Sequence, residues 1–310
     1  MREKFGTIGV LMGGPSSERD ISLKSGNAVY ESLKGLGLNV VKVEIQSDDF
    51  DQNSRLIGMH NINCAFIALH GRYGEDGCIQ ELLEALDIPY TGSGVQASKT
   101  AMDKILSLEV CKKEGLDVPR YQVCQKSDGK IEPPDKSSLD FPLVVKPAAH
   151  GSSIGLSIID TPDLFTQALD LAFKYDGKVI LEEYIQGREI TVGILAQEAL
   201  PVIEIIPKKR FFDYEAKYRP GMTDYIVPAR LCGETAQKAQ DAALRMHRAL
   251  DCFGCSRVDM ILNSQEIPYI LELNSIPGFT ETSLLPKAAK FAGIEFSQLC
   301  LKLLELAFNR

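Results

Sequence analysis

The segments RVDMIL at residues 257–262 and YILELN at residues 269–274 decide the fold at the C-terminal end of the chain. In both segments apolar residues alternate with polar ones, and a period of two places the polar side chains on one face of a β-strand. Asp259 on the first strand, and Glu272 and Asn274 on the second, therefore share a face if the strands are neighbours. We predict an antiparallel pair that presents three oxygen-bearing side chains together.

These side chains have the chemistry of a magnesium site. Carboxylate and amide oxygens are hard ligands, and Mg²⁺ usually takes one or two carboxylates together with substrate phosphates. Arg257 falls on the same face as Asp259, and the loop NSIPG at residues 274–278 follows directly. The alternative is a solvated polar face of a strand pair, which is the commonest fate of such charges. We favour the metal because the acids lie at adjacent strand ends that run into this loop.

The N-terminal part of the chain reads as a parallel α/β unit. We predict buried strands at residues 5–12 and 63–69, an alternating strand at 39–45, and a helix opened by a capping box at Ser17-x-x-Asp20. The loop at residues 70–77 (HGRYGEDG) follows the last strand, and open α/β sheets place ligands at the carboxyl ends of their strands.

The rest of the chain mixes helices with strands. We predict one helix over residues 99–115, an exposed loop over 125–140, and a helix capped by Thr161-Pro162 that runs to Tyr175. Beyond Gly187 a meander begins, and we assign its strands to a larger mixed sheet. The fold class is therefore α/β together with α+β.

Composition limits the classes of function. The chain has 310 residues and a mass of 34.1 kDa, which suits two or three domains. The net charge of -8 disfavours nucleic acid as the main partner. The sequence opens without a signal-peptide pattern and contains no apolar run of membrane-spanning length. We expect a cytoplasmic protein that does not insert into membranes.

The eight cysteines do not form a recognisable metal pattern. Cys252 and Cys255 make the only CxxC, without a second pair or a nearby histidine to complete a zinc site. We predict reduced thiols that are mostly buried.

Three short motifs point to other functions. Gly92-x-Gly94-x-x-Ala97 fits the dinucleotide pattern but follows only a short apolar segment, so a loop before a helix is the better interpretation. Gly151-x-Ser153-x-Gly155 fits the nucleophile elbow of hydrolases, which requires a strand before it and a helix after it. We predict another strand after it, and His247 lies mid-helix, yet a serine hydrolase using Ser153 stays a second hypothesis. No Walker-type GxxxxGK[ST] occurs.

A series of blocks extends over the whole chain in a fixed order: GGPSSERDISLKSG at 13–26, ALHGRYGEDG at 68–77, PYTGSGVQAS at 89–98, MDK at 102–104, VVKPAAHGSSIGLS at 144–157, DYEAKY at 213–218, RVDM at 257–260 and LELNSIPGFTETSLLP at 271–286. Together they closely resemble the D-alanine–D-alanine ligases of the ATP-grasp superfamily. The one visible departure is Ala148-Ala149-His150, where the family often has a Ser-Arg-Glu-like run. We expect these positions only to flank the loop at 151–155.

The resemblance implies an ATP-grasp fold behind an N-terminal parallel α/β domain. It implies domains at residues 1–95, 96–186 and 187–310, the last with the metal site. It also implies ligation of two D-alanines through a D-alanyl phosphate for peptidoglycan precursors, with release of ADP and phosphate.

For the nucleotide, the resemblance implies a site between the sheets of the second and third domains. The residues that would bind ATP are Lys104, Lys146, Ser152, Ser153, Glu182, Glu183, Glu189 and Lys217. Two Mg²⁺ ions, for which Mn²⁺ is an acceptable substitute, would be held by Asp259, Glu272 and Asn274.

For the amino acids, the resemblance implies that Glu18 receives the ammonium of the first D-alanine, with His70 near it. Arg257 and the Gly278 N–H would stabilise the oxyanion, while Ser283 and Leu284 would contact the second substrate. Ser152 and Tyr218 would connect to Glu18 and join two loops into a lid. The partners implied are ATP and D-alanine, with a homodimer through the N-terminal domain. A third hypothesis is an inert ATP-grasp protein that only binds nucleotide.

Overall fold

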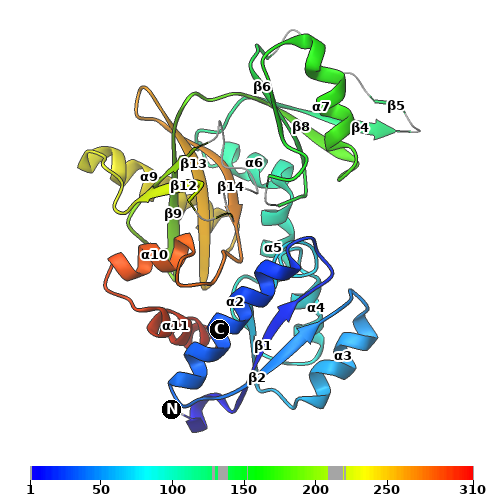
Figure 1. The fold of residues 1–310 in the computed structure, drawn as a ribbon, viewed down its shortest axis with the longest axis vertical. Coiled ribbons are helices and arrows are strands. Elements are labelled where there is room, and N and C mark those ends of the chain that lie inside the picture. The colour runs from blue at the N-terminus through cyan, green and yellow to red at the C-terminus, as the bar shows by residue number, and fades with distance from the viewer. Residues whose placement is uncertain are drawn as a thin grey trace.

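The chain folds into three sheets with helices packed around them, as the computed structural model shows (Figure 1). The structure describes residues 2–127, 130–131, 139–151, 153–208, 219 and 221–309. Among these residues, no helix combines the length and the apolar character needed to cross a membrane.

The N-terminal sheet is parallel, as predicted, with strand order β2-β1-β3. Its unit comprises α1 (Arg2–Phe5), β1 (Thr7–Gly13), α2 (Arg19–Gly35), β2 (Asn39–Ile45), α3 (Phe50–Met59), β3 (Cys64–Ile67) and α4 (Cys78–Ala85). The predicted capping box is wrong. Glu18 is the N-cap residue of α2 and makes no side-chain cap. The hydroxyl of Ser16 accepts the Glu18 N–H and donates to the His70 carbonyl, so the turn closes before Ser17 can act as a cap.

The single helix predicted over residues 99–115 is also wrong. The structure has α5 (Val95–Met102) and α6 (Lys104–Lys113), separated by Asp103. Asp103 has extended backbone angles, and its carboxylate accepts the N–H groups of Ile105 and Leu106. An aspartate that caps a new helix interrupts the old one, and the break places Lys104 at the start of α6. The Gly92–Gly94 segment lies before α5, as expected for a loop.

The central sheet has strand order β5-β4-β8-β6-β7 and is antiparallel. Its elements are β4 (Tyr121–Ser127), β5 (Lys130–Ile131), β6 (Leu143–Pro147), β7 (Ser157–Ile159), η1 (Pro162–Leu164), α7 (Phe165–Ala172) and β8 (Lys178–Glu183). β4 extends into the segment that we predicted as an exposed loop from residue 125. Thr161 makes no side-chain cap and precedes the 3₁₀ turn η1, so the α-helix begins later and ends earlier than predicted.

The C-terminal sheet has strand order β12-β11-β9-β13-β14, with β10 on β9. Its strands are β9 (Gly187–Leu195), β10 (Glu198–Ala199), β11 (Ile203–Pro207), β12 (Thr223–Ile226), β13 (Cys255–Asn263) and β14 (Pro268–Asn274), with α9 (Gly233–Ala249) packed on them. Its described pairings are all antiparallel, so the predicted mixed sheet is wrong. Each strand returns beside a neighbour that runs the opposite way, and a parallel pair would need a crossover.

The predicted pair of strands at the C-terminal end is confirmed. Asp259 on β13 lies opposite Glu272 on β14, and Arg257 lies opposite Asn274. The register shifts after Asp259, which leaves Leu271 as an extra residue in β14. Such bulges bend a strand and redirect its side chains next to functional sites.

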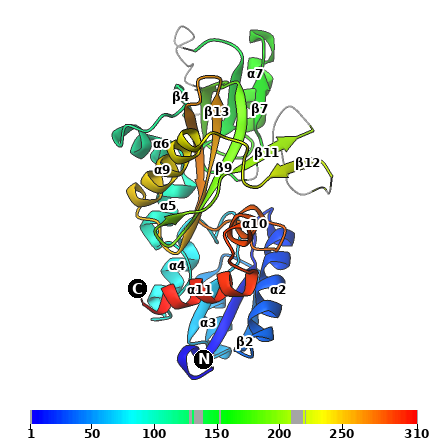
Figure 2. The same ribbon diagram turned by 90° about the vertical axis from the view of Figure 1, so that its left-hand side faces the viewer.

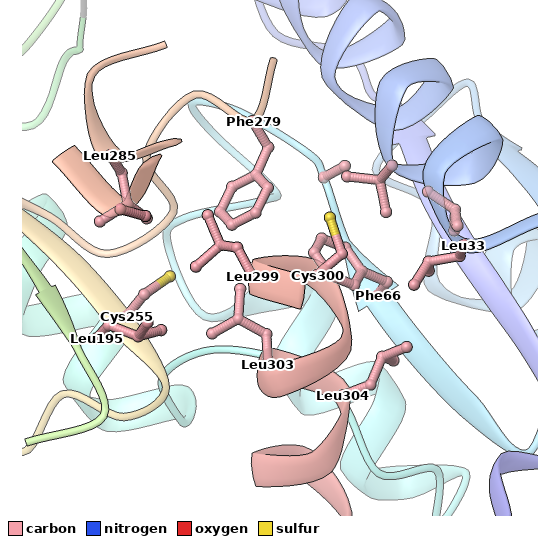
Figure 3. Close-up of a cluster of buried hydrophobic side chains, with 14 of the residues drawn as sticks. Leu33, Phe66, Leu195, Cys255, Phe279, Leu285, Leu299, Cys300, Leu303 and Leu304 are labelled. Carbon is pink, nitrogen blue, oxygen red and sulfur yellow. The ribbon is translucent and has the colours of Figure 1, made fainter. Parts of the chain in front are cut away.

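Two C-terminal helices join the N-terminal unit to the C-terminal sheet. α10 (Leu284–Phe291) and α11 (Phe296–Phe308) lie between the N-terminal sheet and β9 (Figure 2). One cluster of buried side chains includes Phe66 of β3, Leu195 of β9 and Leu299 of α11, with Phe279 in its midst (Figure 3). The loop at residues 275–283 is therefore anchored in a core that both units share.

The cysteines are free, and six of the eight are buried: Cys64, Cys111, Cys124, Cys252, Cys255 and Cys300. Burial raises the pKa of Cys252 and of Cys255 to about 12, which keeps both thiols protonated at neutral pH. The prediction of reduced, mostly buried thiols is confirmed.

Candidate active site

A cavity of about 470 Å³ lies between the central and C-terminal sheets. Side chains from β6, β8, β9, β11, β13 and β14 line it, together with the loop that follows β6. The described residues predicted for nucleotide and metal binding reach this cavity, with Asn274 as the exception: Lys104, Lys146, Ser153, Glu182, Glu183, Glu189, Asp259 and Glu272. Residues far apart in the sequence thus come together between two sheets.

Lys104 stands at one end of this cavity. Its ammonium nitrogen lies 3.3 Å from Glu272 Oε2 and donates to the His150 carbonyl at 2.7 Å. Its backbone N–H is bonded to the Ala148 carbonyl. Our expectation that residues 148–150 only flank the loop is therefore wrong, because they hold Lys104 and His150 itself lines the cavity. Burial and the charges of Arg72 and Lys104 lower the pKa of His150, so its imidazole is neutral at neutral pH.

Lys146 ends a buried strand and forms a buried ion pair. Its nitrogen lies 2.8 Å from Glu182 Oε1, and both side chains are almost inaccessible to solvent. The neighbouring Glu183 turns to Arg120, whose Nε and backbone N–H both donate to its carboxylate. The backbone N–H of Glu183 in turn donates to the Arg120 carbonyl at 2.9 Å, so Arg120 holds both the side chain and the backbone of Glu183.

The carboxylate of Asp259 accepts four hydrogen bonds. Arg257 donates to both of its oxygens, at 2.8 and 2.7 Å, and Thr191 donates to Oδ1 at 2.6 Å. The amide of Asn274 donates to Oδ2 at 3.1 Å. Alternation along β13 and β14 places these side chains together, as predicted. Sequence reasoning missed Thr191, which lies opposite Asp259 on β9.

The acidic residues suit a metal ion that arrives with phosphates. The described part of the chain contains no group of three His, Cys, Asp or Glu side chains that could enclose a metal ion. Asp259 and Glu272 instead provide two carboxylates on adjacent strands, and Asn274 can offer its amide oxygen. Mg²⁺ bound to a nucleotide usually takes one or two carboxylates from the protein, and phosphate and water oxygens fill its other coordination positions. The donor set therefore fits Mg²⁺.

A second cavity, of about 440 Å³, lies between the N-terminal unit and the loop at 275–283. Every residue predicted for D-alanine lines it: Glu18, His70, Arg257, Gly278, Ser283 and Leu284. Glu18 is buried between two glycines. A Cβ built on Gly71 would stand 2.7 Å from Glu18 Oε2, and a Cβ built on Gly151 would stand 3.1 Å from the same oxygen. The carboxylate thus sits where the N-terminal unit meets the loop that follows β6.

His70 is held from both sides. Nε2 lies 2.9 Å from the hydroxyl of Ser25, and Nδ1 lies 3.7 Å from Glu75 Oε1. Burial raises the pKa of Glu75, with His70 and the Gly71 N–H opposing this effect. Sequence reasoning missed Ser25 and Glu75. Glu75 belongs to the loop at 70–77, and nothing in the sequence distinguishes it from an ordinary polar residue of an exposed loop.

Ser283 faces Gly278 within the same cavity. Its hydroxyl accepts the Thr280 N–H at 3.1 Å, and a Cβ on Gly278 would stand 3.1 Å from it. Three further predicted residues, Ser152, Lys217 and Tyr218, lie outside the described residues.

The nucleophile elbow is absent. The loop at 151–155 joins β6 to β7, two antiparallel strands, and no helix follows Ser153. His247 is wholly buried in α9, where Nδ1 lies 2.7 Å from the hydroxyl of Ser256. Burial lowers its pKa to about 4. The strand predicted after this loop is confirmed as β7.

Comparisons with known proteins agree with this geometry. The family described as "D-ala D-ala ligase C-terminus" matches residues 110–305, and "D-ala D-ala ligase N-terminus" matches residues 44–93. The chain belongs to the D-alanine–D-alanine ligase family. Relatives that bear this name, from Geotalea uraniireducens and Pelotomaculum thermopropionicum, are each 46% identical over 97% of this chain and cover 95% and 96% of their own lengths.

Solved structures of the family show the same fold. The D-alanine–D-alanine ligase of Bacillus anthracis complexed with ATP is 34% identical, with a TM-score of 0.85 over 98% of this chain and 97% of its own. A second structure of that ligase is 37% identical, with a TM-score of 0.87 over the same shares. The chain therefore has the ATP-grasp fold of these ligases, behind a parallel α/β unit.

Proposed function

We propose that this protein is a D-alanine–D-alanine ligase: it joins two D-alanines with ATP as the phosphoryl donor and releases ADP and phosphate. Its product would serve peptidoglycan precursors. The names of relatives that match the whole chain support the reaction, and the ATP complex of the Bacillus anthracis ligase supports the nucleotide.

The observation that carries the proposal is the pairing of Arg257 with Asp259. Arg257 lines the second cavity and Asp259 the first, and two hydrogen bonds join their side chains. Asn274 lines the second cavity and donates to Asp259 as well. A phosphoryl group in one cavity and a carboxylate in the other would thus meet at the hydrogen-bonded side chains of Arg257, Asp259 and Asn274. Two neighbouring pockets that place both substrates at one point are what a two-substrate transfer requires.

In the first cavity, Lys104 and Lys146 would contact the phosphates and offset their charge. Glu182, Glu183 and Glu189 would accept hydrogen bonds from adenine and ribose, and Ser153 belongs to the loop that would cover the phosphates. Asp259, Glu272 and Asn274 would hold two Mg²⁺ ions, or Mn²⁺ in their place. When bound, the metal would offset the charge of the transferring phosphoryl group.

In the second cavity, Glu18 would bind the ammonium of the first D-alanine, close to His70. The carboxylate oxygen of this D-alanine would attack the γ-phosphorus, the bond to ADP would break, and D-alanyl phosphate would form. The deprotonated amine of the second D-alanine would then attack the acyl carbon. The C–N bond would form first, and Arg257 and the Gly278 N–H would stabilise the resulting oxyanion. The bond between the acyl carbon and the phosphate oxygen would then break, with its electron pair on the leaving phosphate, which would take up the surplus amine proton. Ser283 and Leu284 would position the second substrate.

Three residues outside the described part complete the proposal. Ser152 and Tyr218 would connect the loop at 151–155, and the segment that joins β11 to β12, to Glu18 as a lid. Lys217 would approach the phosphates. A lid is needed because water would hydrolyse the acyl phosphate. We also propose domain boundaries at 95/96 and 186/187, close to the start of α5 and of β9.

A coupled assay tests the proposed reaction. We expect release of phosphate that requires both ATP and D-alanine, equimolar with dipeptide, and its loss in Glu272→Gln. The matched control is Glu198→Gln, because Glu198 is an exposed glutamate on β10 of the same sheet. Phosphate release without D-alanine would instead indicate a nucleotide hydrolase, and nucleotide binding without turnover would indicate an inert ATP-grasp protein.

We further propose a homodimer through the N-terminal domain, on the family resemblance alone. Sedimentation equilibrium should give twice the chain mass of 34.1 kDa. A monomer at micromolar concentration would remove this part of the proposal without affecting the reaction.

A further inference from the structure

Ser25 of α2 bridges two parts of the molecule. Its side chain is wholly buried, and its hydroxyl lies 2.9 Å from His70 Nε2. The same oxygen accepts the Phe279 N–H at 3.2 Å. His70 belongs to the loop after β3, whereas Phe279 belongs to the loop at 275–283 after β14. One hydroxyl group therefore connects the N-terminal unit to the loop that carries Gly278.

The direction of these hydrogen bonds follows from the available protons. The Phe279 N–H can only donate, so Ser25 accepts there and keeps its own proton for another partner. An oxygen of Glu75 near Nδ1 favours a proton on that nitrogen, which leaves Nε2 as the acceptor. Ser25 then donates to Nε2. The groups form an ordered sequence from Glu75 through His70 and Ser25 to Phe279.

The last group of this sequence controls the shape of the loop. The Phe279 N–H shares a planar peptide unit with the Gly278 carbonyl and Cα, so a fixed N–H also fixes these atoms, and the Gly278 Cα is bonded directly to the Gly278 nitrogen. The Phe279 ring packs edge-on against Phe66 at 5.5 Å in the shared core (Figure 3). The ring anchors the residue, and the hydrogen bond sets the rotation of its peptide plane.

We infer that Ser25 is a positioning residue for the ligation reaction: its hydroxyl holds the Phe279 N–H, and through it Gly278, in a fixed position relative to His70. The inference rests on the proposed function, because it concerns the oxyanion donor of that reaction. Ser25 itself does not line the second cavity, whereas His70 and Gly278 do. It acts through them, and a glycine at 278 has no side chain to hold its own position.

Helix α2 supplies a matched control in Ser22. Its side chain is equally buried, its hydroxyl accepts the Gly13 N–H at 2.8 Å, and it donates to the Ala68 carbonyl at 2.8 Å. Both of these partners lie in the N-terminal unit. Loss of either serine leaves a buried N–H without its acceptor, so both variants should lose stability. Only the loss of Ser25 should alter the loop at 275–283.

The experiment compares Ser25→Ala with Ser22→Ala in the full chain. For Ser25→Ala we expect kcat/KM for D-alanine to fall roughly tenfold, because a buried donor loses its partner. We expect KM for ATP to stay constant and the Phe279 amide to exchange its hydrogen faster. Ser22→Ala should show none of these changes at a comparable thermal midpoint. If Ser25→Ala does not fold, Ser25→Cys, which keeps a weak donor and acceptor, should show a smaller change of the same kind.

A double-mutant cycle adds a test that general destabilisation would not pass. Ser25→Ala combined with Glu75→Gln should cost less than the product of the two single losses, because both variants interrupt one sequence of contacts. Losses that multiply, or equal kinetics for Ser25→Ala and Ser22→Ala, would overturn the inference. Should the wild type lack D-alanine-dependent turnover, the proposed function fails, and exchange at Phe279 still decides whether Ser25 positions the loop.

Discussion

Lys146 and Glu182 form an ion pair between strands β6 and β8, with Nζ and Oε1 2.8 Å apart. Both residues are buried, with 6% and 2% of their surface exposed. A buried charge without its partner is costly, whereas removal of both charges often costs little. Single and double substitutions of this pair can therefore distinguish its contribution to stability from its proposed contribution to phosphate binding.

We expect Lys146→Met to lower the free energy of unfolding by about 3 kcal/mol and to abolish ATP binding. The double variant Lys146→Met/Glu182→Gln should regain most of the stability, because no unpaired charge remains, but should still fail to bind ATP. Urea unfolding and titration calorimetry would measure the two effects. A double variant as unstable as the single one would show that the methionine packs badly and that charge is not the cause.

Thr191 is expected to support Asp259. Its hydroxyl donates to Oδ1 at 2.6 Å, and outer partners of a metal ligand typically affect metal affinity or activity by roughly 10–100-fold. Thr191→Val should raise the Mg²⁺ concentration needed for half-maximal activity by roughly tenfold. Thr191→Ser keeps the hydroxyl and serves as the control. Equal Mg²⁺ dependence for the two variants would contradict the role.

The site also shows what a sequence can and cannot predict. Alternation along 257–262 and 269–274 is enough to place Asp259, Glu272 and Asn274 on one face, because a strand has a strict period of two. The break at Asp103 escapes prediction, because a capping aspartate and a mid-helix aspartate look the same in a sequence. The break bears on the proposed site, since it allows Lys104 to begin a new helix beside His150.

The contacts of Ser25 and Thr191 could not be predicted for a different reason. Each is a small hydroxyl residue whose partner is far away in the sequence: Phe279 for Ser25 and Asp259 for Thr191. Hydrophobic periodicity locates an element but does not give the register between distant elements. Only the packed structure brings such pairs together.

His247 should make stability depend on pH. Burial lowers its pKa in the folded state to about 4, from a usual value of 6.5. The unfolded chain therefore binds a proton that the folded chain does not, and stability falls as the pH drops from 6.5 towards 4. We expect a loss of about 3 kcal/mol over this window from this residue. Chemical denaturation at several pH values would measure the slope. His247→Gln should flatten it, and an unchanged slope would assign the effect to other groups.

The two glycines beside Glu18 provide the sharpest test of its proposed role. A Cβ on Gly151 would stand 3.1 Å from Glu18 Oε2 in otherwise open space, so Gly151→Ala should move the carboxylate slightly without straining the backbone. Gly71 has a φ of +69°, and its Cβ would stand 2.7 Å from the same oxygen, so Gly71→Ala should both displace Glu18 and destabilise the fold.

We expect Gly151→Ala to raise KM for D-alanine roughly tenfold with an unchanged thermal midpoint, because small misplacements of a binding group are costly. Gly177→Ala is the control, since a Cβ there meets nothing within 4 Å. Initial-rate kinetics and thermal unfolding would separate the variants. If Gly151→Ala behaves like Gly177→Ala, a small displacement of Glu18 has no consequence for the substrate, and the ammonium of the first D-alanine must be bound elsewhere in the second cavity.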